Sequence, residues 1–121
     1  MQDAAKTYGA VAIKTASPRE LEADLLLSAA ARLQAIRDSW DGNQSRLDAA
    51  LQYNRKLWSI FMTSATSPEN ALPAGVRQNV ANLGIFVFNH TLTVLANPKP
   101  ENLGTLININ RQLAAGLLGR A

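Results

Sequence analysis

The sequence has no cysteine and only one histidine, His90, among its 121 residues. The absence of cysteine excludes a disulfide framework, a thiolate metal site and a cysteine nucleophile. A single histidine also excludes a multi-histidine metal site, although a Ser-His-Asp hydrolase stays formally possible. The composition therefore argues against metalloenzyme chemistry.

Charge is sparse, and long apolar runs are missing. Charged residues make up 17% of the chain, below the roughly 25% of an average soluble domain, so part of the surface should be apolar or rich in amides. The net charge is +3, but the basic residues are scattered from Lys6 to Arg120 and form no nucleic-acid-binding tract. The N-terminus has no signal-peptide core, and no apolar run of about 18 residues suggests a membrane span. We expect a cytoplasmic protein without membrane insertion, for which nucleic acid is an unfavoured partner.

Turn-forming residues divide the chain into four segments of helical length. The clearest boundary is Ser17-Pro18, because Ser17 can cap backbone N–H groups and Pro18 loses no hydrogen bond at the first helical position. Apolar residues recur at steps of three and four in each segment, as on one face of a helix. The expected helices are residues 18–38, residues 44–65, the stretch between Pro73 and Pro98, and residues 100–118. We predict an all-α fold, a compact antiparallel bundle of four main helices in a domain of residues 17–121.

The third predicted helix has two apolar faces. One face carries Val76, Val80, Leu83, Val87, His90 and Val94. The other carries Ala81, Ile85, Phe88, Leu92 and Leu95. The two faces lie roughly 140° apart at about 100° per residue, so this helix should be central in the bundle or meet a partner.

Residues 1–16 form a separate, marginal segment. Its alanine-rich sequence has one weakly apolar side, and Gly9 lowers its helix propensity. That side carries Ala4, Tyr8, Val11 and Ala12. Two arrangements are open: Tyr8 and Val11 rest in the groove that a partner later takes, or the segment is a permanently docked fifth helix that completes the core.

Two asparagines stand near the centres of apolar stripes, where leucine would pack without unsatisfied polar groups. Asn54 and Asn110 each begin an Asn-Arg-x-Leu pattern. One interpretation is that the two amides bond to each other or to backbone and set the bundle register. The other is that Arg55 and Arg111, one position along, frame a partner-binding groove. His90 is expected to be a core histidine satisfied by a neighbouring carbonyl or amide.

Other polar and aromatic residues have structural interpretations. Glu20, Glu22 and Asp24 lie at the start of the first helix, where the macrodipole favours negative charge. Trp40 and Trp58 fall on core-facing stripes, so burial is the expected role of both.

Four sequence elements, taken in order, resemble the FlaF family of bacterial flagellar biosynthesis proteins. They are residues 16–22 (ASPRELE), residues 51–58 (LQYNRKLW), Leu72-Pro73, and residues 107–111 (ININR). The resemblance implies a small cytoplasmic protein required for flagellin production and export. Such a protein acts as a flagellin-specific export chaperone or regulator, often opposed by the partner regulator FlbT. The resemblance carries over no catalytic, cofactor-binding or metal-binding residue.

On this basis we expect flagellin as the partner, with FlbT as a second candidate. The predicted partner-binding residues are Tyr53, Arg55, Leu57, Ile85, Phe88, Leu92 and Arg111. The predicted structural polar core is Asn54, His90 and Asn110. A homodimeric helical scaffold and an RNA-contacting post-transcriptional regulator of flagellin are the alternatives, and the sequence leaves the oligomeric state open.

Overall fold

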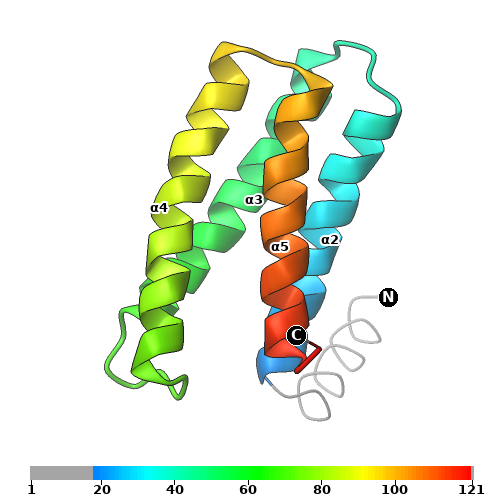
Figure 1. Cartoon of the computed structure of the whole chain (residues 1–121). Coiled ribbons are helices and arrows are strands. Elements are labelled where there is room, and N and C mark those ends of the chain that lie inside the picture. Colours follow the sequence, from blue (N-terminus) through cyan, green and yellow to red (C-terminus); the bar gives the residue numbers. More distant parts are fainter. Residues whose placement is uncertain (1–17, 121) are drawn as a thin grey trace, which may run out of the picture.

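The computed structural model describes residues 18–120, which form an antiparallel helical bundle (Figure 1). The elements are α2 (Pro18–Asp38), α3 (Gln44–Ala65), α4 (Ala74–Ala96), the 3-10 turn η1 (Pro100–Asn102) and α5 (Leu103–Leu117). No strand occurs in this part of the chain. The predicted all-α fold is confirmed, and the expected bounds of the first two helices coincide with α2 and α3. The prediction for residues 1–16 lies outside the described residues.

Local signals account for the helix ends. Asn43 caps α3, where its side chain accepts a hydrogen bond from the backbone N–H of Arg46 at 3.2 Å. After α5, Gly119 adopts a positive φ of 73°, and Arg120 N donates to Ala115 O at 2.7 Å. This is the Schellman arrangement, which satisfies the last carbonyls of a helix.

The connection into α5 differs from the prediction, which had the helix begin at residue 100. Residues Pro100–Asn102 form a 3-10 turn, in which Asn102 N donates to Lys99 O at 3.1 Å. Pro98 and Pro100 have no N–H to donate, so the chain makes a tight turn before α-helical bonding starts at Leu103.

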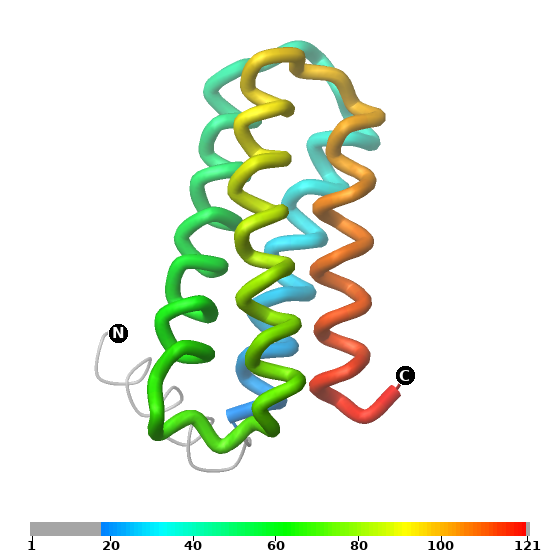
Figure 2. Tube along the Cα trace, turned by 60° about the vertical axis from the view of Figure 1, so that its left-hand side comes forward, coloured from blue at the N-terminus to red at the C-terminus, as the bar shows by residue number. Residues whose placement is uncertain are grey.

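The four helices pack unequally. Helix α2 packs most extensively on α5 and α3 packs on α4, whereas α4 and α5 touch only thinly. Figure 2 shows α3 and α5 on opposite sides of the bundle, with α4 in front of α2. The buried core draws on all four helices, with Leu26, Leu33, Leu51, Trp58, Val87, Leu106 and Ile107 among its largest members. Helix α4 is therefore an edge helix and not the centre of the bundle.

The two apolar faces of α4 have different surroundings. Val80, Val87 and Val94 from the first face are buried, whereas Ile85 and Leu92 from the second are 55% and 64% exposed. By length and composition alone α4 could cross a membrane, a property shared by core helices of soluble proteins. Its buried stripe packs in the bundle, so the unusual feature of α4 is the apolar face that the bundle leaves uncovered.

Candidate functional site: a polar core and an apolar groove

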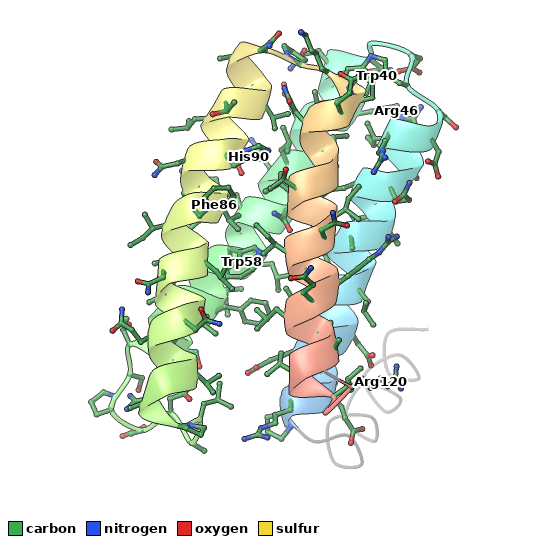
Figure 3. The ribbon with its side chains drawn as sticks, in the orientation of Figure 1. Trp40, Arg46, Trp58, Phe86, His90 and Arg120 are labelled. Carbon is green, nitrogen blue, oxygen red and sulfur yellow. The ribbon has the colours of Figure 1, made fainter. Side chains whose placement is uncertain are left out.

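The centre of the bundle contains a chain of buried hydrogen bonds. Asn110 Nδ2 donates to Asn54 Oδ1 at 2.6 Å, and Trp58 Nε1 donates to Asn110 Oδ1 at 2.9 Å. All three side chains are fully buried, and Figure 3 shows Trp58 inside the bundle. The bonds join α3 to α5 across the diagonal, so they tie together two helices that are not nearest neighbours.

One group of this network has no partner. Asn54 Nδ2 is buried without a hydrogen bond, which costs stability because the amide has given up its bonds to water. Amide pairs of this kind are best known for setting helix register. Asn54, Asn110 and Trp58 are fully buried, so they present no surface to a ligand in this structure.

His90 lies apart from the two asparagines. It is half-buried on α4, where Nε2 lies 2.8 Å from the backbone oxygen of Asn102 and the ring stacks on Phe86 with 5.7 Å between centroids. The contact with a neighbouring carbonyl is as expected, but it connects α4 to the start of α5 at the side of the bundle. His90 is therefore not a member of the central polar core.

Arg55 and Arg111 do not frame one groove. Arg55 is exposed on α3, where it lines one hollow beside α4 and another beside Arg32 of α2, whereas Arg111 Nη2 donates to Gln34 Oε1 of α2 at 3.3 Å. Helices α3 and α5 run in the same direction and present Asn54 and Asn110 toward each other. One residue further along, each helix has turned by about 100° in the same sense, so the two arginines point to opposite flanks.

Two other predicted partner-binding residues are occupied by the fold. Leu57 is only 6% exposed and belongs to the hydrophobic core of the bundle, so it offers a partner almost no surface in this structure. Tyr53 is half-buried, and the guanidinium of Arg32 lies 4.0 Å from its ring centroid. A cation over the ring face is attractive, so Tyr53 already has a partner within the chain.

Three of the predicted partner-binding residues, Arg55, Phe88 and Leu92, line a surface groove of about 520 Å³ between α3 and α4. We call this surface the α3–α4 groove. Its lining is Asp48, Leu51, Gln52, Arg55 and Ser59 from α3, and Phe88, Thr91, Leu92 and Leu95 from α4. Ile85 lies outside it, on the same exposed face of α4. The groove thus has a mainly polar wall and a mainly apolar wall.

Sequence reasoning found only part of this groove. It identified Arg55, Phe88 and Leu92 but missed the polar wall of α3. The missed polar residues were still detectable, because Asp48, Gln52, Arg55 and Ser59 follow one another at steps of four, three and four. That spacing places them on one face of a helix.

The acidic residues of the described part of the chain bear on whether it could hold a metal ion. Among residues 18–120, no cluster of three histidine, aspartate or glutamate side chains could hold a metal ion. Burial raises the pKa of the Glu22 carboxyl, and the positive charge of Arg19 partly opposes this. Glu22 lies at the base of the bundle beside a small cavity of about 20 Å³, far too small for an organic substrate.

The fold and the site define a class: a small antiparallel helical bundle with a closed polar core and an open amphipathic groove on its surface. A family model described as "Flagellar protein FlaF" matches residues 4–117. The match covers nearly the whole chain, so this chain belongs to the FlaF family of flagellar proteins. No curated protein and no solved structure matches it.

Proposed function

We propose that this flagellar protein binds flagellin in the α3–α4 groove, in the cytoplasm, and acts as a flagellin export chaperone or as a regulator of flagellin synthesis. Family membership supports a role in the flagellar system. The observation that carries the proposal is the exposed apolar face of α4, where Leu92 is 64% and Ile85 55% exposed. Clusters of exposed apolar side chains on a small domain commonly mark interaction sites.

The two walls of the groove suit an amphipathic helix. Phe88, Leu92 and Leu95 offer apolar contacts along α4, and Asp48 and Arg55 offer one charge of each sign along α3. A helix laid in such a groove buries its apolar stripe and keeps its polar edge near the charged wall. The terminal segments of flagellin are amphipathic helices that need protection before assembly, so they have the required chemistry.

A matched pair of surface variants tests this proposal. Leu92 and Ile60 are 64% and 61% exposed, but only Leu92 lines the α3–α4 groove. Burying a leucine contributes about 1.5–3 kcal/mol, so Leu92→Ser should weaken binding of monomeric flagellin about 10- to 100-fold. Ile60→Ser should leave the affinity unchanged. Equal losses in the two variants would move the binding site elsewhere.

Calorimetry on the wild-type protein tests the kind of contact. Burial of apolar surface predicts a negative heat-capacity change, and the sparse charge predicts a weak dependence of affinity on salt. Flagellin that co-purifies from cells should crosslink near the α3–α4 groove. No detectable binding at micromolar flagellin would contradict the proposal.

One observation favours RNA contact as a second candidate. Arg32, Arg55 and Lys56 gather around Tyr53 on the outer surface of α2 and α3, an arrangement that the scattered basic residues of the sequence did not reveal. Contacts with phosphates make affinity fall steeply with salt. A flat salt response of RNA binding would exclude this role. A homodimeric scaffold would instead show a mass that depends on concentration, and FlbT stays a candidate partner to be tested in the same binding assay.

A further inference from the structure

The outer surface of α2 and α3 carries a cluster of positive charge. A hollow of about 560 Å³ is lined there by Arg32 from α2 and by Tyr53, Arg55 and Lys56 from α3. We call it the α2–α3 hollow. The guanidinium of Arg32 lies 4.0 Å from the centroid of the Tyr53 ring, so a cation–aromatic contact joins the two helices within the cluster.

Within residues 18–120, no carboxylate pairs with the three cations of this hollow. The ion pair that forms in this part of the chain joins Arg46 to Asp41, and no acidic side chain lines the α2–α3 hollow. Helix α3 has no acidic residue after Asp48, whose carboxylate accepts a hydrogen bond from Gln44 at 2.8 Å. The hollow therefore presents positive charge to solvent and is complementary to an acidic ligand.

Exposed apolar side chains adjoin the cations on both helices. Ile60, 61% exposed, follows Lys56 by one turn on α3, and Leu25, 44% exposed, precedes Arg32 by about two turns on α2. The two helices run antiparallel (Figure 1), so both apolar residues lie on the same side of the contact between Arg32 and Tyr53. The outer surface thus has a cationic part and, nearer the base of the bundle, an apolar part.

We propose that this outer surface binds an acidic, amphipathic helix of a protein partner. The carboxylates of that helix pair with Arg32, Arg55 and Lys56, and an apolar side chain about one or two turns further along covers Ile60. Arginine binds carboxylates through two parallel hydrogen bonds. The contact with Tyr53 holds Arg32 in place before binding, which lowers the entropy lost on association.

The aliphatic residues favour a protein over RNA as the occupant. Phosphates would use the cations but gain nothing from Ile60, whereas bases bind by stacking on aromatic rings. Tyr53 is half-buried, and Arg32 already lies over its ring. A strand of RNA also follows basic side chains over several nucleotides, and α3 carries no charge beyond Lys56.

Two matched pairs of variants in the full-length protein test this proposal. The probe is a fluorescein-labelled, alanine-based helical peptide whose one face carries two glutamates and then two leucines, and its binding is followed by fluorescence anisotropy. A control peptide has glutamine in place of glutamate. Ile60→Ser is compared with Leu92→Ser, which is similarly exposed but lies in the α3–α4 groove. Lys56→Gln is compared with Lys99→Gln, since both lysines are exposed.

We expect saturable binding of the glutamate peptide and weaker binding of the glutamine peptide. Ile60→Ser should weaken binding of the glutamate peptide about 5- to 20-fold. Lys56→Gln should weaken it about two- to fivefold, with a smaller effect at high salt. Leu92→Ser and Lys99→Gln should leave it unchanged.

Three results would overturn the proposal. They are the absence of saturable binding, equal affinity for the two peptides, and a loss in Leu92→Ser as large as that in Ile60→Ser. A labelled single-stranded RNA serves as a second probe. RNA that binds where the peptide does not, and that is weakened by Lys56→Gln but not by Ile60→Ser, would assign the surface to RNA instead. Flagellin enters none of these measurements, so their outcome is independent of the function proposed above.

Discussion

Asn54 and Asn110 are equally buried but unequally bonded, so replacing each with leucine should have different consequences. Asn110 makes two bonds, one as acceptor from Trp58 and one as donor to Asn54. Asn54 accepts one bond, and its own Nδ2 has no partner. The two substitutions make the same chemical change at fully buried positions, which makes each the control for the other.

The expected changes in the free energy of unfolding follow from counting the buried polar groups that each substitution leaves without a hydrogen bond. Asn110→Leu leaves Asn54 Oδ1 and the Trp58 N–H unbonded, at about 1–3 kcal/mol each. Against this loss of about 2–6 kcal/mol, the added apolar surface returns about 1–2 kcal/mol. Asn54→Leu removes the unbonded Nδ2 of Asn54 but leaves Asn110 Nδ2 without its acceptor. The number of buried donors without a hydrogen bond therefore stays the same. We expect Asn110→Leu to be less stable than Asn54→Leu by at least about 2 kcal/mol.

Urea unfolding followed by far-UV circular dichroism measures this difference. With an m value of about 1–2 kcal/mol/M, a gap of about 2 kcal/mol separates the two midpoints by about 1–2 M. Both variants should keep the helical spectrum of the wild type. Equal midpoints, or a lower midpoint for Asn54→Leu, would refute the reasoning about the bonding of the polar core.

Three further perturbations test other parts of the structure. Burial raises the pKa of the Glu22 carboxyl, so the folded protein disfavours the charged form and its stability falls as pH rises through this titration. Glu22→Gln should therefore raise the melting temperature at neutral pH, and this gain should fade below the ordinary pKa of 4.5. A Cβ at Gly84 would collide with the side chain of Met62, so Gly84→Ala should lower the free energy of unfolding by about 1 kcal/mol, although alanine has the better helix propensity. Urea titration measures this loss, and it should disappear in a Met62→Ala background. Asn43→Ala should cost about 0.5–2 kcal/mol by the same measurement through loss of the α3 cap, and an unchanged midpoint would show that the cap contributes nothing.

Functional residues were predicted less completely than helices. The exposed second face of α4 was visible as a second apolar stripe, and Phe88 and Leu92 from it do line the α3–α4 groove. The stripe alone could not distinguish burial at the centre of a bundle from exposure at its edge. The packing of α4 on α3, with little contact to α5, settled that question.

The sequence by itself determined where the helices lie. The bounds of α2 and α3 could be read directly because caps and breaks such as Pro18 and Asn43 act on backbone groups within a few residues. Apolar spacing likewise depends only on the pitch of one helix. The burial of Asn54 and Asn110 was also indicated, since each stands within an apolar stripe.

Only the tertiary structure decided which neighbour each face meets. The bond between Asn54 and Asn110 was one of several possible partnerships, and it needed α3 and α5 to face each other across the bundle. The same arrangement turns Arg55 and Arg111 to opposite flanks, although both follow an identical local motif. The sequence of a helix fixes the direction of each side chain relative to the helix axis. How far the helix is rotated about that axis, and so which neighbour each side chain meets, depends on the packing of all the helices together.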